Sequence, residues 1–393
     1  MKRLLLTLSA MMLLAACGGG TAASSPSAAS PAPNSAPARP AASTAGSASA
    51  KPAASAASNA STKPAASAGA SAAAKPAGNL ATVTYGGMVP APVSDSGIYI
   101  ADAKGWFAEQ GIKLDVQNFA TAADAVAPLA RDQLQVAGGS TGAGLSNAVN
   151  RGVDVFITAD KATTSPGHGY AAILVRTDLK DQIKSPADFK GKKIAIGGKA
   201  IAPESALAQA LKQANLTLKD VDLTTMPIPD MPAAMAGKSI DIALPVEPTV
   251  TAIVSQGTGV LLARTDQYEP NEQFAVLLYS PAFAKTPLAE KFMTAYLKGV
   301  RYYNDAFDKK VPAARQEVID ILSSKTTLKD KALYDKVVMP GLDPDGKVNV
   351  QDLKLQEAYY IASGQQQGPT NFDKLVNMSF AEAAVKQLGP YSR

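Results

Sequence analysis

Residues 82–119 carry the pattern that most constrains the fold. Thr82–Tyr85 alternates polar and apolar side chains, and Ile112–Val116 does the same, so each predicts a strand. Between them, Ile98–Phe107 places apolar residues at near-helical spacing. Two parallel strands joined by a short helix leave their first loop at the carboxyl end of a strand, where ligands bind in open α/β sheets. That loop supplies four candidate ligand-binding residues: Met88, Pro90, Pro92 and Ser94.

The rest of the chain repeats this alternation of short strands and helices, which argues for an α/β fold. The further predicted strands are 134–138, 153–158, 171–176, 221–228, 259–264 and 274–279. The predicted helices are 122–132, 203–213, 287–308, 313–322, 329–338, 352–362 and 380–388. Residues 82–393 are enough for two lobes.

The opening stretch resembles the solute-binding proteins of the nitrate/sulfonate/taurine and thiamine-precursor uptake family. Tyr99–Ala101, Lys104–Phe107 and Glu109–Ile112 carry this resemblance, with Trp106 and Phe107 as an expected core pair. Two later stretches, Asp188–Ile196 and Lys238–Ala243, match the family in the same order. The resemblance therefore extends over nearly all of the chain beyond residue 82.

The resemblance implies a periplasmic-binding-protein type II fold, with two lobes, a hinge and a ligand cleft between the lobes. Lobe one would comprise residues 82–166 and 275–393, and lobe two residues 167–274. A ligand would favour the closed state by contacting both lobes. The implied protein captures a small polar or aromatic organic solute for the permease of an ABC importer, as a monomer without a cofactor or a catalysed reaction. Sulfonate, nitrate, pyrimidine and aromatic-acid ligands all remain open.

The first 16 residues predict a lipoprotein signal peptide. Lys2 and Arg3 precede an apolar run of about 13 residues, which is too short to span a bilayer well. The run ends in Leu14–Gly18, which resembles a bacterial lipobox and implies lipid attachment to Cys17. An ordinary secretory signal with an incidental cysteine is the alternative. The expected location is extracytoplasmic, anchored to the cell membrane on its periplasmic side or at the cell surface, and a single cysteine allows no intrachain disulfide.

Residues 17–81 consist almost entirely of Ala, Ser, Pro, Gly and Thr, which predicts a disordered tether. Its expected span is roughly 40–50 Å by flexible-chain scaling. A glycosylated or wall-penetrating stalk is the alternative. Of the 38 basic residues, six precede residue 82 and no acidic residue does, so residues 82–393 hold 32 basic and 33 acidic residues. This balance gives no reason to expect a nucleic-acid partner.

A glycine-rich loop at 139–144 separates a predicted strand from a predicted helix. It lacks the lysine of a P-loop and the full spacing of a dinucleotide fingerprint, so a nucleotide site is not expected. Ser140, Thr141 and nearby backbone N–H groups could instead hold an anion or the polar edge of a ligand. Helix capping without a ligand is the alternative.

Four more residues are candidates for the cleft. His168 lies between two glycines at the predicted hinge, and because it is the only histidine, no site with several histidine ligands can form. Lys199 and Ala200 lie in the loop before a helix, although Lys199 could be a plain surface charge. The hydroxyl residues that sulfonate and nitrate binders of the family tend to have there are absent. Glu247 could accept a hydrogen bond from a ligand or cap a helix.

Two other functions and one metal site were weighed against this interpretation. A thiamine-pyrimidine-synthase-like enzyme on the same fold would need His168 and a lysine such as Lys199, and a ligand-sensing surface lipoprotein is the second alternative. Asp343–Asp352 resembles half of a calcium loop, but Gly341 stands where the first ligand belongs. A turn followed by a helix cap, without metal, is the expectation there.

Overall fold

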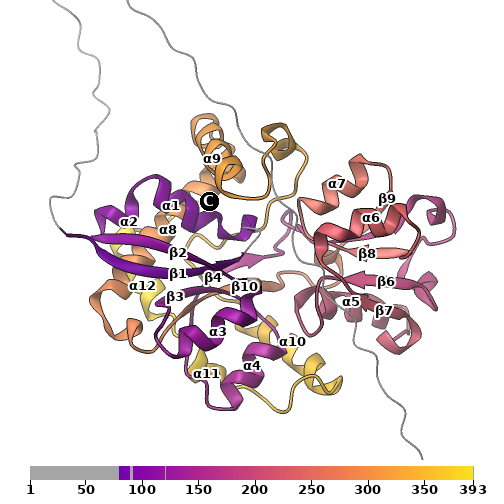
Figure 1. Cartoon of the computed structure of the whole chain (residues 1–393), viewed down its shortest axis with the longest axis horizontal. Helices are drawn as coiled ribbons and strands as arrows, with labels where there is room; N and C mark the ends of the chain where they lie inside the picture. Colours follow the sequence, from indigo (N-terminus) through magenta and orange to yellow (C-terminus); the bar gives the residue numbers. More distant parts are fainter. Residues whose placement is uncertain (1–78, 89–91, 120, 393) are drawn as a thin grey trace, which may run out of the picture. The chain divides into compact units, whose positions relative to one another are not determined.

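The computed structural model describes residues 79–88, 92–119 and 121–392 (Figure 1). The predicted signal peptide, Cys17, the tether and the candidate Pro90 lie outside these residues. All described residues belong to one compact unit, and none of their helices is both long and apolar enough to cross a membrane.

The first sheet has five strands in the order β2-β1-β3-β10-β4. Their bounds are β1 Ala81–Met88, β2 Ile112–Phe119, β3 Val136–Ser140, β4 Phe156–Thr163 and β10 Gln273–Tyr279. Strand β1 pairs in parallel with β2 and β3, whereas β10 pairs antiparallel with β3 and β4. The strand that lies between β3 and β4 therefore comes from more than 100 residues further along the chain than either of them.

The second sheet repeats this plan in the order β7-β6-β8-β5-β9. Its bounds are β5 Ala172–Arg176, β6 Lys193–Ile196, β7 Asp222–Thr225, β8 Ile242–Leu244 and β9 Gly259–Arg264. Strand β6 is parallel to β7 and β8, and β5 is antiparallel to β8 and β9. The chain enters this sheet through residues 164–171, the first crossing, and leaves it through residues 265–272, the second crossing. The α/β prediction is confirmed.

Each sheet with its helices is one lobe. The helices of the first lobe are α1 Ser96–Ala103, α2 Trp106–Glu109, α3 Ala122–Ala130, α4 Ala143–Asn150, α8 Pro287–Phe307, α9 Pro312–Lys325, α10 Val350–Ala362, α11 Phe372–Leu375 and α12 Ser379–Leu388. Those of the second lobe are α5 Ala202–Gln213, α6 Met231–Ala236 and α7 Thr249–Ser255. Short 3-10 helices lie at Val93–Asp95, Thr177–Leu179, Pro186–Phe189, Leu218–Asp220, Ile228–Asp230, Thr265–Gln267, Phe283–Lys285 and Lys331–Asp335.

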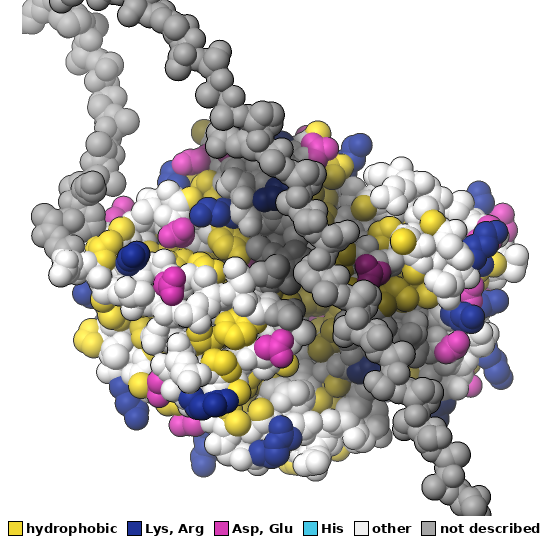
Figure 2. Space-filling model, viewed as in Figure 1, with side chains coloured by type: hydrophobic (Ala, Val, Ile, Leu, Met, Phe, Trp, Pro, Cys, Tyr) yellow, Lys and Arg dark blue, Asp and Glu magenta, His cyan; other side chains and the backbone are white. Residues whose placement is uncertain are grey.

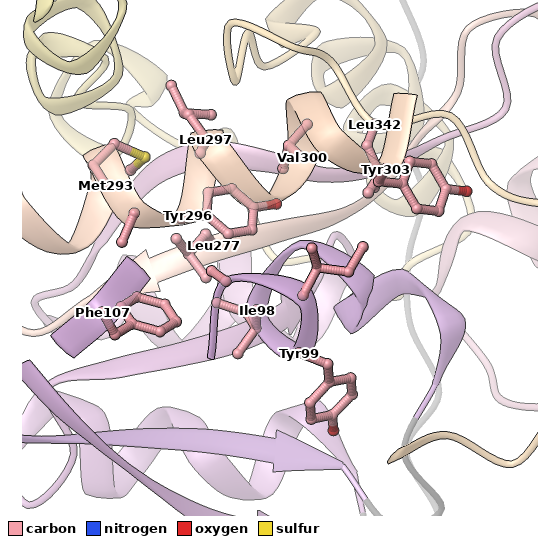
Figure 3. Packing of buried hydrophobic residues seen from close by; sticks show 14 of the residues in the cluster. Ile98, Tyr99, Phe107, Leu277, Met293, Tyr296, Leu297, Val300, Tyr303 and Leu342 are labelled. Atoms are coloured by element: carbon pink, nitrogen blue, oxygen red, sulfur yellow. The ribbon is translucent and has the colours of Figure 1, made fainter. Parts of the chain in front are cut away.

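Helices α1 and α8 form the centre of the larger core, which covers one face of the first sheet (Figure 3). Phe107 lies in this core with 1% of its surface exposed, as expected, whereas Trp106 is only partly buried and meets the ring of Tyr302 edge-on. The opposite face of the sheet is covered by apolar residues of α3, α4, α10 and α11. Burial on both faces explains why the strands of this sheet are rich in apolar and small residues.

Several predicted bounds were wrong, for reasons that lie outside the local sequence. Strand β4 begins at Phe156 rather than at 153 and continues to Thr163, because its limits follow its pairing with β10. Strand β3 continues to Ser140, so Gly139 and Ser140 are not in a loop; β10 pairs with both of them. The predicted helix 329–338 is reduced to the 3-10 turn Lys331–Asp335, and the strand predicted at 221–228 ends at Thr225, before Pro227.

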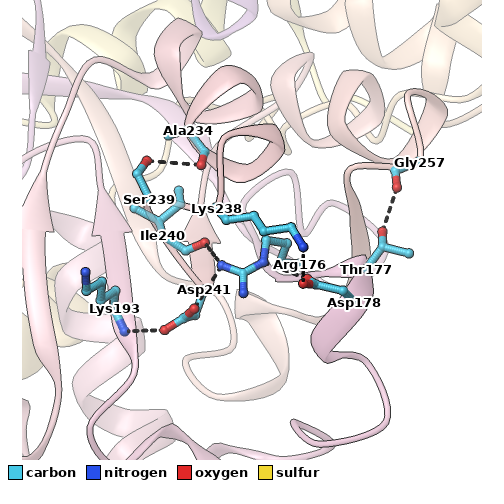
Figure 4. A network of polar contacts seen from close by, with 10 residues as sticks. All are labelled: Arg176, Thr177, Asp178, Lys193, Ala234, Lys238, Ser239, Ile240, Asp241 and Gly257. Atoms are coloured by element: carbon cyan, nitrogen blue, oxygen red, sulfur yellow. Dashed lines mark hydrogen bonds and ion pairs between the residues drawn. The ribbon is translucent and has the colours of Figure 1, made fainter.

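A polar network ties together the strand ends of the second sheet (Figure 4). Arg176, at the end of β5, donates to the Asp241 carboxylate at 2.9 Å and to the Ile240 carbonyl at 2.7 Å. The other oxygen of Asp241 accepts the Lys193 backbone N–H at 3.0 Å. The family-like step at Lys238–Ala243 therefore has a structural role, because its aspartate fixes β5 and β6 beside β8.

Candidate functional site

The two lobes meet where strand-end loops touch across the gap between the sheets. Gly142 and Ile201 form an isolated β-bridge, and the Ala143 N–H donates to the Ala200 carbonyl at 3.1 Å. Gly142 and Ala143 follow β3, whereas Ala200 and Ile201 follow β6. The glycine-rich stretch after β3 and the loop before α5, which the sequence suggested separately, are therefore in contact between the two lobes.

Ser140 and Thr141 differ in what their hydroxyl groups are free to do. Ser140 is half-buried at the end of β3, and its hydroxyl makes no hydrogen bond to any described residue. Thr141 is 2% exposed, and its hydroxyl donates to the Gln273 carbonyl at 2.5 Å. Ser140 can thus present a donor and an acceptor to a ligand, whereas the Thr141 hydroxyl fixes the loop to β10.

A buried ion pair lies beneath the loop that follows β1. Lys161 and Asp95, 3% and 1% exposed, are 2.5 Å apart, and Lys161 also donates to the Ser94 hydroxyl at 3.1 Å. The Tyr85 hydroxyl donates to the same carboxylate at 2.8 Å, and burial together with that carboxylate raises the pKa of Tyr85 well above its ordinary value. The candidate Ser94 is therefore held inside this cluster, whereas Met88 and Pro92 are only half-buried.

His168 lies apart from the other candidates. Its Nδ1–H donates to the Met339 carbonyl at 3.1 Å, and its Nε2 lies 3.4 Å from the Asp308 carboxylate. It lines a hollow of about 720 Å³ formed by residues of the two crossings and of the first lobe: Thr163, Ser165, Pro166, Asn271, Asn304, Asp308, Lys309, Gly341, Leu342, Asp343, Pro344, Lys347, Val348, Asn349 and Tyr391. Lys199 is not among these residues. His168 and Lys199, the two residues that the thiamine-pyrimidine-synthase-like alternative would need, therefore do not share this hollow.

The loop before α5 is bound to both lobes. Lys199 is exposed and forms no ion pair with a described residue. Ala200 has a positive φ of 54°, and its N–H donates to the Glu204 carboxylate at 2.7 Å. Sequence reasoning missed Glu204, which is fully buried and also accepts from the Tyr359 hydroxyl at 2.8 Å and the Gln365 amide at 2.6 Å. This carboxylate joins α5 to the C-terminal part of the first lobe.

Glu247 acts as a helix cap in this structure. One carboxylate oxygen accepts the Thr251 N–H at 2.9 Å, in the first turn of α7. The other lies 3.1 and 3.2 Å from the Arg264 guanidinium and 3.4 Å from the Val338 N–H. Both oxygens therefore have partners, which is the capping alternative that the sequence left open.

An aromatic pair at the hinge was not among the predicted residues. Tyr170 in the first crossing and Phe274 in β10 have ring centroids 4.8 Å apart at 60°. They pack with Ala162 and Ala275 and with the partly buried Val246. Ala275 pairs with Ser140, so this apolar cluster lies beside the free hydroxyl group. The available sequence clue was that each of the two predicted lobe boundaries, 166/167 and 274/275, has one of these aromatic residues at or near it.

The calcium-like loop contains a turn and a helix cap. The Asp343 carboxylate accepts the backbone N–H groups of Asp345 and Lys347, and Asn349 caps α10. Asp352 points away from the turn and accepts the Gln273 N–H at 2.6 Å. No group of three or more metal-ligating side chains occurs in the part of the chain that the structure describes.

Comparison with known proteins places this arrangement in a recognised fold. The sulfonate-binding protein SsuA from Xanthomonas axonopodis pv. citri, bound to MOPS, is 18% identical over 77% of this chain and 100% of its own, with a TM-score of 0.61. The nitrate-binding protein NrtA from Synechocystis PCC 6803 is 15% identical over 79% of this chain and 89% of its own, with a TM-score of 0.62. These likenesses confirm the periplasmic-binding-protein type II fold.

The same fold also occurs in an enzyme. The desulfurization enzyme DszB is 14% identical over 78% of this chain and 99% of its own, with a TM-score of 0.57. No curated protein matches the sequence. The family described as NMT1/THI5 like, however, matches residues 94–306, more than half of the sequence. The chain therefore belongs to the NMT1/THI5-like family.

Proposed function

We propose that this protein is the extracytoplasmic solute-binding component of an ABC importer and that it performs no chemistry on its ligand. The contact between the loops after β3 and β6 carries the proposal, because it joins two lobes that only two chain crossings connect. A ligand held between such lobes adds contacts to both and shifts the population toward the closed form. Sulfonate- and nitrate-binding proteins of the same fold support this role.

The ligand we propose is a small organic solute with a planar or aromatic part and a polar group. Phe274, which is half-buried and packs on the buried Tyr170 ring, offers the apolar surface, and Ser140 offers a hydroxyl beside it. Lys161 and Arg264 are each already paired with a carboxylate, so neither provides a spare charge for a strongly anionic solute. These contacts favour a pyrimidine or an aromatic acid over nitrate within the classes expected from the sequence.

We further propose two lobes with the bounds expected from the sequence, residues 82–166 with 275–393 and residues 167–274, except that Gln273 and Phe274 belong with β10 to lobe one. We also propose that a lipid on Cys17 holds the monomer at the membrane. The lipobox-like end of the apolar run supports the anchor. Cys17→Ser is expected to release the protein into the soluble fraction or to leave its precursor uncleaved. Membrane retention equal to that of the wild type would contradict the anchor.

Native mass spectrometry of the full chain, followed by a thermal-shift panel of sulfonates, nitrate, pyrimidines and aromatic acids, tests the binding role. A ligand at a hundredfold excess over its Kd stabilises the folded state by about 2.7 kcal/mol, which shifts the unfolding temperature measurably. Ser140→Ala should weaken the ligand that is found, and Ser255→Ala, at the exposed end of α7, should not. A ligand recovered with an altered mass would contradict the non-enzymatic role, and silence across the panel would contradict the proposed ligand classes.

A further inference from the structure

Three buried carboxyl groups meet at the second crossing. Glu269, Glu272 and Asp352 are 1%, 0% and 5% exposed. Glu269 and Glu272 belong to the crossing, and Asp352 belongs to α10 of the first lobe. Glu269 accepts a hydrogen bond from the Ser205 hydroxyl of α5 at 3.1 Å, and its other oxygen is buried next to the Asp352 carboxyl group without a hydrogen-bond partner among the described residues. Two buried carboxyl groups placed side by side can hydrogen bond to each other only if one of them holds a proton.

No positive charge compensates the cluster. Among the described residues, no lysine, arginine or histidine forms an ion pair with any of the three carboxyl groups. Both oxygens of Glu272 are buried without a hydrogen-bond partner in the described part of the chain. The side chains that face the cluster are neutral or acidic: Ser205 of α5, Gln356 and Tyr360 of α10, Tyr170 and Thr164 of the first crossing, and Asp160 of β4. An ionised carboxylate in such a place is costly.

We propose that this cluster is a proton-controlled latch that regulates closure of the ligand cleft. The inference rests on the proposed function, because it concerns the opening and closing of the same cleft. The protonated Glu269 donates to Asp352 and accepts from Ser205, and so ties α10 of the first lobe to α5 of the second. Loss of that proton leaves like charges in contact across the lobe boundary, with the tie removed.

The direction of the pH effect follows from the buried state. Burial, and next the neighbouring Asp352 charge, raise the pKa of Glu269 from 4.5 to about 8 in this structure, in which the loops of the two lobes touch. Opening would expose the group to water and return its pKa toward the ordinary value. The closed form therefore binds the extra proton on Glu269. The stabilisation of the closed form over the open form by this proton is complete below pH 4.5 and is lost as the pH rises through about 8.

Neighbouring titrations do not produce the same effect. Burial raises the pKa of Tyr170 and Tyr360 well above their ordinary values, so both stay neutral in this range, and burial also raises the pKa of Glu272, which favours its neutral form. Burial raises the pKa of Asp160 to about 7, but its carboxylate accepts from Gln273 and from the Asp343 N–H, both in the first lobe. Its titration therefore does not make or break a contact between the lobes.

The latch can be measured as a distance between the lobes in the full chain. Fluorophores at Lys219→Cys and Lys291→Cys, both exposed and on different lobes, in a Cys17→Ser background would report it by energy transfer. We expect the distance to lengthen between pH 6 and 9.5, with a midpoint near 8. Glu269→Gln should abolish the change, because the amide can donate to Asp352 and accept from Ser205 without titrating.

Matched variants separate the latch from general effects of charge. Glu382→Gln removes an exposed carboxylate on α12 and should keep the wild-type pH profile. Asp352→Asn should also abolish the change, because an amide there can donate to ionised Glu269; it serves if Glu269→Gln fails to fold. A distance that does not respond to pH in the parent protein, or the same response in a folded Glu269→Gln protein, would overturn the latch. No transported solute is used, so this result stands apart from the ligand panel.

Discussion

One methyl group at position 142 should hold the two lobes apart. A Cβ on Gly142 would lie 2.4 Å from the Ala200 carbonyl oxygen of the other lobe. The φ of Gly142 is 177°, which is extended backbone that alanine adopts equally well, so the first lobe itself should be unstrained. Gly142→Ala is therefore expected to disturb closure and little else.

The size of the effect follows from that contact. Such Cβ contacts essentially do not occur below 3.0 Å, so the loops must separate by at least 0.6 Å, the difference from 2.4 Å. The Ala143 N–H to Ala200 carbonyl bond, 3.1 Å long, would then lengthen or break. Loss of this hydrogen bond destabilises the contact by about 1 kcal/mol net, and the steric overlap of the added methyl group costs about 1–3 kcal/mol more. The closing equilibrium should thus fall by roughly 30- to 700-fold.

Hydrogen exchange of the Ala143 amide measures this change, because its protection depends on how often the loop contact opens. Gly142→Ala should lose protection at this amide by the same factor while its thermal unfolding temperature stays close to that of the wild type. Gly144→Ala is the matched control, since a Cβ there has no atom within 4 Å. It should keep the protection and gain about 0.5–1 kcal/mol from a better helix residue.

Two results would refute the reasoning. If Gly142→Ala keeps full protection at Ala143, the contact between the loops does not limit opening of the lobes. If its unfolding temperature falls by many degrees, position 142 matters for the fold of the first lobe rather than for closure.

Two further substitutions test the interior of the first lobe. Lys161→Met should destabilise the fold by about 3–5 kcal/mol in chemical denaturation, because Asp95 would keep a buried charge without its partner. Adding Asp95→Asn should recover most of this loss, and a double variant no more stable than the single one would count against the ion-pair explanation. Gly299→Ala should lower the unfolding temperature, because a Cβ there would lie 2.1 Å from the Gly97 carbonyl of α1 and force α1 away from α8, at about 1–3 kcal/mol. An unfolding temperature equal to that of the wild type would contradict the tight helix contact.

The local pattern of polar and apolar residues predicted most strands and helices, but it predicted their ends only where turn residues mark them. Strand β9 has the predicted bounds, and β5 and β10 each differ by one residue, because alternation and turn residues mark them in the sequence. The loop predicted at 139–144 was shortened by β10, which pairs with Gly139 and Ser140 from more than 130 residues away. Pairing partners at that separation leave no trace in a short window of sequence.

The site residues show the same limit more strongly. His168 lies in the first crossing, and the side it faces is set by Met339 and Asp308, far along the chain. In the sequence, Glu204 looks like an ordinary acidic residue in the first turn of a helix. The hydroxyl group that donates to it belongs to Tyr359, 155 positions later in the chain. A carboxylate's role depends on which groups surround it, and for these residues the surroundings come from the other lobe.

Several contacts between the lobes come from one short segment, residues 200–205, and this has a consequence for the latch. Ala200 and Ile201 meet the loop after β3, and Glu204 and Ser205 meet α10 and the second crossing. Residues this close in one loop and helix turn move together, so opening at Gly142 should also release Glu269 to water. Linkage then requires that Gly142→Ala lower the midpoint of the pH-dependent opening, from near 8 toward the ordinary carboxyl value. An unchanged midpoint in a variant that has lost its Ala143 protection would show that the loop contact and the latch open independently.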